Sequence, residues 1–200
     1  MKSTRELIDE DKVDWSDKDS IIDFYTKNQL YFNNYQLLTD RESIIYIIET
    51  KLAYCKALES RHKYSLIIPI LEHIDNMLYK IKDSNDFDRI NENYLFNKGV
   101  AFERLKNFEE SQKNFSQLLN LYPEDELYKR WYKSNKNAIW AKKFKFIGYI
   151  GAFIVFMGLA MDIIFNVKID RAFTFIGLFF ALTGFFIEDG KNYLDKLLKK

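Results

Sequence analysis

The chain has 200 residues and a formal net charge of +1, because 30 Lys and Arg residues balance 29 Asp and Glu residues. This balance argues against a dedicated nucleic-acid binder, which is usually strongly basic. A single cysteine, Cys55, excludes a disulfide within the chain and is typical of a reducing cytosol.

Six stretches before residue 144 repeat apolar residues at helical spacing, with short polar breaks between them. They cover about residues 20–38, 40–60, 64–82, 87–106, 108–121 and 124–143. Such short breaks make neighbouring helices antiparallel. We expect an acidic, flexible arm at residues 1–18 and one cytosolic helical domain at 19–143, whose last helix continues into the segment that follows.

The segment from residue 93 to residue 124 reads NYLFNKGVAFERLKNFEESQKNFSQLLNLYPE. It resembles the tetratricopeptide repeat, in which small residues let two antiparallel helices touch and aromatic residues fill the space between them. The matching positions are Leu95, Gly99, Phe102, Phe108, Ser111, Phe115, Leu118 and Pro123. Lys98 and Leu118 depart from the family pattern, so we expect looser packing around them.

A more degenerate copy lies 44 residues earlier. Leu58, Tyr64, Ile67, Leu71 and Ile74 align with the second half of the pattern, and Cys55 takes the small position of Gly99, whereas Lys51 does not match Leu95. The resemblance covers about residues 41–123, and the helices at 19–38 and 124–143 would cap its two ends. It implies a stack that binds a peptide or helix of another protein in a groove. The candidate groove residues are Asn97, Val100, Ala101 and Arg104. The alternative is that these residues only face solvent and bind no partner.

Two apolar runs, 144–165 and 172–187, follow the helical domain. No charged residue interrupts Phe146–Met161 or Ala172–Ile187, and apolar residues circle every face of both runs. Because about 20 apolar residues cross a bilayer, we predict a two-helix transmembrane hairpin, with a short second helix and a polar cytosolic tail at 188–200. The alternative is a buried helical hairpin of a soluble domain.

Basic residues before the first run and in the tail outnumber those in the turn at 166–171, so we expect both termini in the cytoplasm. Small residues within the runs would let the two helices approach closely, or would support a homo-oligomer. These residues are Gly148, Gly151, Ala152, Gly158, Gly177, Ala181 and Gly184. Asp162 either pairs with a basic residue of the turn or lies at headgroup depth.

The sequence contains no phosphate-binding glycine loop and no GxSxG motif. His62 and His73 lack a second cysteine or a close histidine, so a zinc site has little support. We expect a non-catalytic, all-α adaptor without metal or cofactor, held at the inner membrane of a bacterium as a multi-pass protein that binds another protein and no nucleic acid. The alternative function is a membrane effector or immunity-type protein whose hairpins oligomerise while the helical domain senses a signal.

Overall fold

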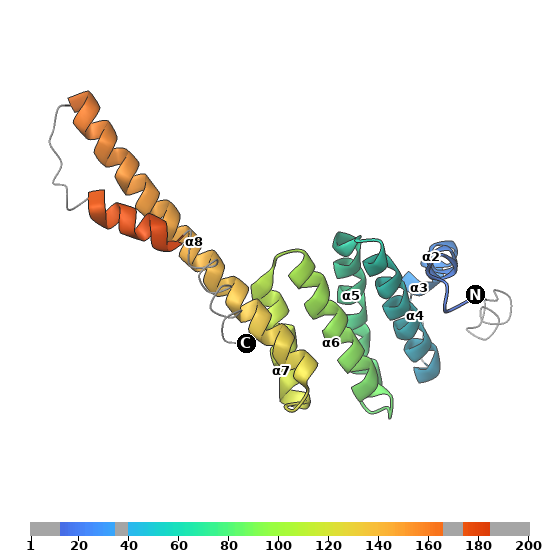
Figure 1. The fold of residues 1–200 in the computed structure, drawn as a ribbon. Coiled ribbons are helices and arrows are strands. Elements are labelled where there is room, and N and C mark those ends of the chain that lie inside the picture. Colours follow the sequence, from blue (N-terminus) through green and yellow to red (C-terminus); the bar gives the residue numbers. More distant parts are fainter. Residues whose placement is uncertain (1–12, 35–39, 166–173, 185–200) are drawn as a thin grey trace. The chain divides into compact units, whose positions relative to one another are not determined.

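A computed structural model describes residues 13–34, 40–165 and 174–184 (Figure 1). The described elements are all helical, and no strand occurs among them, which confirms the all-α class. The chain divides into two compact units, Met1–Asn135 and Lys136–Lys200, which we call the N-terminal and C-terminal units. The boundary between them falls before the predicted one at residues 143–144.

The elements of the described residues follow each other with short connections. They are α2 (Lys18–Lys27), α3 (Gln29–Asn33), α4 (Arg41–Ser60), α5 (Tyr64–Leu78), the 3-10 helix η2 (Tyr79–Ile81), α6 (Phe87–Arg104), α7 (Phe108–Leu121), α8 (Glu126–Phe165) and a helix at Thr174–Gly184. Within the N-terminal unit, α4 packs on α2, α5 and α6, and α6 packs on α5 and α7. Figure 1 shows α4 to α7 side by side, each antiparallel to the one before it.

Two of the predicted helices are interrupted. The helix expected at 20–38 breaks at Asn28, whose side-chain amide donates to the carbonyl oxygen of Phe24 at 3.0 Å, in competition with the backbone. The helix expected at 64–82 changes to a 3-10 turn after Leu78. The last helix of the predicted domain does continue into the first apolar run, because α8 extends from Glu126 to Phe165.

Side-chain caps define several helix starts. Asp17 accepts hydrogen bonds from the backbone N–H groups of Asp19 and Ser20, and Asp40 accepts one from Ser43 at 2.7 Å. The latter bond holds the pKa of the Asp40 carboxyl below its ordinary value. Asn107 caps α7 through the N–H of Glu110. Each cap satisfies backbone donors that have no partner inside the helix.

The core of the N-terminal unit is made of aliphatic and aromatic side chains from α2 to α8. Its largest fully buried apolar side chains are Phe32, Ile47, Ile48, Leu71, Ile74, Met77, Ile81, Ile90, Phe115 and Leu118. These positions follow the helical period seen in the sequence, so burial of one face of each helix accounts for the stacking.

Candidate functional site

The C-terminal unit exposes large apolar side chains that a water-soluble protein would bury. Phe153 of α8 is 62% exposed and Phe156 is 67% exposed. The same holds along the rest of the apolar surface, at Phe146, Ile147, Tyr149, Ile150, Met157, Leu159, Phe175, Ile176, Leu178, Phe179, Phe180 and Leu182. Contiguous apolar surface of this extent marks a site of contact with a membrane or another protein.

One helix among the described residues is long and apolar enough to cross a membrane, the part of α8 from Glu126 to Met161. The apolar helix Thr174–Gly184 is shorter. At about 1.5 Å per residue it rises about 16 Å, against about 30 Å of hydrocarbon in a bilayer. Residues 172–173 and 185–187 of the predicted second run lie outside the described residues, as do the turn at 166–171 and the tail.

Glycines bring this short helix into backbone contact with α8. A Cβ added at Gly151 would lie 2.5 Å from the backbone nitrogen of Ala181 and 2.6 Å from the carbonyl oxygen of Gly177. One added at Gly184 would collide with the backbone of Gly148. Gly177 faces Val155, whereas Gly184, later in the chain, faces Gly148, which comes earlier in α8. The two helices are therefore antiparallel.

Most of the small residues predicted to pack in this unit therefore meet each other. Gly148, Gly151, Gly177 and Gly184 are buried and Ala181 is half-buried at the contact. Ala152 is exposed, and Gly158 is half-buried on α8. The side chain of Asp162 lies outside the described residues.

Lysines and an indole ring precede the apolar surface. Lys136, Lys142, Lys143 and Lys145 are exposed, and Trp140 is 53% exposed. The Nζ atom of Lys143 lies 5.8 Å from the centroid of the Trp140 ring, within the range of a cation–π contact. A tryptophan that is apolar on its faces and polar at its N–H suits a membrane–water interface.

In the N-terminal unit, α6 and α7 meet at Gly99. A Cβ there would lie 2.8 Å from the Phe115 ring, and the Ser111 hydroxyl donates to the Gly99 carbonyl oxygen at 2.8 Å. Phe115 is 0% exposed and stacks on Trp131 of α8 with the ring centroids 5.3 Å apart. The structure thus brings together the small and the aromatic residues of the sequence pattern at a single interface.

The remaining pattern residues lie around that interface. Leu95 and Leu118 are buried, Phe102 and Phe108 are half-buried, and Pro123 is exposed in the turn after α7. In the copy 44 residues earlier, Cys55, Leu58, Ile67, Leu71 and Ile74 are buried, and Tyr64 is half-buried. All the aligned residues except Pro123 are therefore buried or half-buried.

The turns after α4 and α6 have the same hydrogen bonds. The N–H of Lys63 donates to the Leu58 carbonyl and that of His62 to Glu59, at 3.0 and 2.9 Å. The N–H groups of the residues 44 positions later, Asn107 and Lys106, donate to Phe102 and Glu103, both at 2.9 Å. His62 and Lys106 have positive φ values of 57° and 61°. Each turn is a Schellman motif with a non-glycine residue in the left-handed position.

Of the four candidate groove residues, Asn97, Val100 and Ala101 are buried in the N-terminal unit. The Asn97 amide donates to the Asn93 carbonyl oxygen at 2.6 Å. Arg104 is exposed, and its guanidinium carbon lies 5.9 Å from the Trp131 ring centroid. Arg104 is therefore the member of this set whose side chain is open to a partner.

A buried lysine occupies the position that fails to match the repeat pattern. Lys51 is 1% exposed, and its amine lies 3.2 Å from both the Tyr25 hydroxyl of α2 and the Asn33 side-chain oxygen of α3. Burial lowers the pKa of this amine to about 8, partly offset by Cys55. The contact ties α2 and α3 to α4, and no Asp or Glu side chain of the described residues forms an ion pair with this amine.

No group of three or more His, Cys, Asp or Glu residues among the described residues is placed to hold a metal ion. His62 is exposed beside the Tyr64 hydroxyl, and His73 lies half-buried on α5. Burial raises the pKa of the Cys55 thiol to about 12, which opposes formation of the thiolate needed for a nucleophile.

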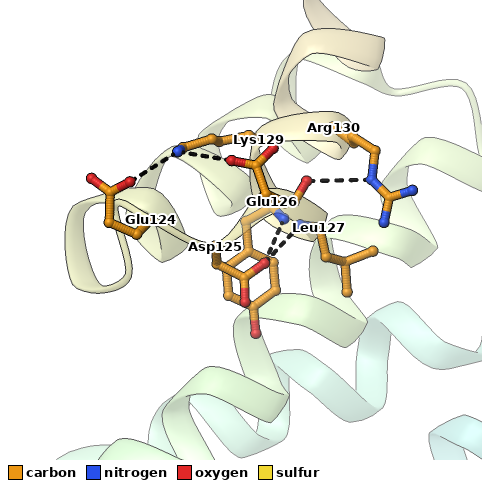
Figure 2. A network of polar contacts seen from close by, with 7 residues as sticks. Glu124, Asp125, Glu126, Leu127, Lys129 and Arg130 are labelled. Atoms are coloured by element: carbon orange, nitrogen blue, oxygen red, sulfur yellow. Dashed lines mark hydrogen bonds and ion pairs between the residues drawn. The ribbon is translucent and has the colours of Figure 1, made fainter.

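The start of α8 is held by a local polar network (Figure 2). The Asp125 carboxylate accepts hydrogen bonds from the N–H groups of Leu127 at 2.8 Å and Tyr128 at 3.1 Å. Lys129 bridges Glu124 and Glu126 at 3.3 and 3.0 Å. These acidic residues suit the positive end of the helix dipole, so the network has a structural role in beginning α8.

The chain was compared with family models, with curated proteins and with solved structures, and none of the three comparisons found a match.

Proposed function

We propose that the protein is a non-catalytic adaptor anchored in the inner membrane of a bacterium, with a tetratricopeptide-like stack on the cytoplasmic side. The observation that carries the proposal is the exposed apolar surface of α8 and Thr174–Gly184. In water, exposed apolar surface costs about 25 cal/mol for each Å², whereas hydrocarbon removes that cost. An anchored stack would concentrate a partner protein at the membrane surface.

The antiparallel contact between α8 and Thr174–Gly184 supports an anchor in the form of a transmembrane hairpin. Gly184 lies beside Gly148, at the end of the apolar run of α8 that is nearest to the basic residues. The chain would thus leave the bilayer on the side where it entered. Because positive residues stay on the cytoplasmic side, both termini would be cytoplasmic in this multi-pass arrangement.

The repeated turns support the stack. Two helix pairs, α4 with α5 and α6 with α7, end their first helix with the same Schellman motif 44 residues apart. Such stacks bind a peptide or helix of another protein. A fold of this kind does not by itself imply catalysis. The partner is expected to contact the exposed side of the first helices, where Arg104 of α6 lies.

The alternative function, a membrane effector, requires the small residues to form contacts between the hairpins of different chains. Gly148, Gly151, Gly177 and Gly184 contact one another within one chain, so we keep the adaptor as the proposal. Permeability of cells that overexpress the protein, with and without Gly177→Leu and Gly184→Leu, compares the two: leakage that vanishes in the variant would favour the effector.

Two measurements on the full chain in its native cells test the proposal. After alkaline carbonate washing, the protein is expected in the membrane pellet, and its recovery in the supernatant would contradict the anchor. A photocrosslinking residue at Arg104 is expected to yield one discrete protein adduct, whereas the same residue at Lys113, exposed on α7, yields none. Equal adducts from both positions, or none from either, would contradict the adaptor.

A further inference from the structure

A ring of lysine side chains surrounds α8 directly before its exposed apolar surface begins. Lys136, Lys142, Lys143 and Lys145 are exposed, and no Asp or Glu occurs between Lys136 and Met161. This part of the helix therefore carries four positive charges with no negative charge along its length.

The four lysines lie on different sides of the helix. At about 100° per residue, Lys136 and Lys143 share a face with Trp140, whereas Lys142 and Lys145 lie on the opposite side. A single acidic partner docked on one face would meet only half of this charge. A planar layer of negative groups that the helix passes through would meet all of it.

The residues around the ring fix its depth. Trp140 is 53% exposed, stacks on Phe144 with the centroids 5.9 Å apart, and receives Lys143 over its ring. Phe146, the next residue after Lys145, begins the exposed apolar surface. Indole rings settle at headgroup level, so the lysines would lie where lipid phosphates are and the phenylalanines where the acyl chains are.

We propose that this ring selects anionic phospholipids around the anchor. The inference rests on the proposed membrane anchor and names the lipid class that the anchor binds. Lysines near a membrane surface each gain about 1 kcal/mol from anionic headgroups, which corresponds to roughly a fivefold preference. The attraction is screened by salt, because the headgroup charges face water.

The test uses the full chain reconstituted into vesicles of equal parts phosphatidylglycerol and phosphatidylcholine. The protein is extracted in a mild detergent, and the lipids that remain bound are quantified by mass spectrometry. We expect phosphatidylglycerol to be enriched about fivefold over phosphatidylcholine, and the enrichment to fall at high salt. The variant is Lys136→Gln, Lys142→Gln, Lys143→Gln and Lys145→Gln together, for which we expect a ratio near that of the vesicles.

The matched control removes four exposed lysines of the N-terminal unit and is expected to keep the enrichment. It combines Lys18→Gln, Lys63→Gln, Lys82→Gln and Lys113→Gln. An equal enrichment in both variants, or none in the wild type, would overturn the inference. If the variant without the four lysines keeps its lipids but no longer crosslinks in cells to a protein that contacts the ring in the wild type, the ring binds an acidic protein instead.

Failure of the anchor is distinguishable from failure of the lipid selection. In the same vesicles, protein that resists carbonate washing yet binds both lipids equally would contradict the lipid selection alone. Protein that the wash removes would contradict the anchor and, with it, this inference.

Discussion

Phenylalanine side chains have opposite environments in the two units of this protein. Phe115 of the N-terminal unit is 0% exposed, whereas Phe153 and Phe156 of the C-terminal unit are more than 60% exposed. A helical chain in water buries one face of each helix, and the N-terminal unit follows that rule. The C-terminal unit does not follow it, as we would expect of helices in hydrocarbon, which is the environment proposed for this unit.

The glycines at the helix contacts also differ between the two units. At Gly99 an added Cβ would meet the ring of Phe115, so in the N-terminal unit a glycine makes room for a large side chain. At Gly151 and Gly184 it would meet backbone atoms of the neighbouring helix. Backbone-to-backbone packing is how membrane helices associate, because burial of apolar surface there gives no hydrophobic drive.

The largest expected effect compares one substitution at two phenylalanines. Phe115→Ala removes a fully buried ring and should lower the free energy of unfolding of the N-terminal unit by about 4 kcal/mol. Phe156→Ala should change that free energy by less than about 0.5 kcal/mol. Urea unfolding of the full chain in mild detergent, followed by the fluorescence of tryptophans in the two units, checks both. Equal losses would contradict the division of the chain into two environments.

The next effect concerns the backbone contact in the C-terminal unit. Gly151→Leu should force the two helices apart at a cost of about 3 kcal/mol, roughly a hundredfold shift in their pairing. Ala152→Leu adds a similar volume at an exposed position and should leave the pairing intact. Spin labels at Ile150 and Leu182 report the distance between the helices, with the wild-type chain as the labelling blank. A broad distance distribution in both variants would refute the contact.

Much of the fold follows from periodicity in the sequence, and the α6–α7 interface follows from the spacing of Gly99, Ser111 and Phe115. The break at Asn28 does not, since an asparagine within a helical pattern either faces solvent or competes for a backbone carbonyl. The partners of Lys51 could not be inferred either. Its position on the apolar face of α4 is periodic, but Tyr25 and Asn33 reach it from other helices.

A smaller effect is the pH dependence of stability that Lys51 causes. Its folded-state pKa of about 8 lies below the ordinary value of 10.5, so the unfolded chain holds the proton more tightly between these values. Stability contributed by Lys51 therefore rises with pH in this window, by about 1 kcal/mol per unit, and the cost of its charge is present in full below pH 8. Cys55 and Tyr25, whose raised pKa values act in the opposite sense, cancel in a comparison with Lys51→Met.

Urea unfolding of the wild type and Lys51→Met at pH 7.5, 8.5 and 9.5 checks this. The wild type should gain stability relative to the variant as the pH rises. A difference that stays constant, or falls, would contradict the burial of an amine without a carboxylate.

The smallest effect lies in the two repeated turns. Lys106→Gly and His62→Gly relieve a left-handed backbone at a non-glycine residue, and each should raise the free energy of unfolding by up to about 1 kcal/mol. Lys56→Gly, at an exposed position in the interior of α4, should lower it by about 1 kcal/mol. Thermal unfolding followed by circular dichroism measures all three. A loss of stability at both turn positions would argue against the shared motif.

The membrane location of the exposed apolar surface is tested most directly by thiol accessibility in native membranes. In a chain that carries Cys55→Ala, single cysteines are placed at Phe153 and Phe156, and at the exposed positions Lys56 and Lys133 of the N-terminal unit. With a small water-soluble maleimide in opened vesicles, we predict rapid labelling of the two lysine positions and labelling of the two phenylalanine positions only after the membrane is dissolved in detergent. Rapid labelling at Phe153 and Phe156 in intact bilayers would place that surface in water and contradict the anchor.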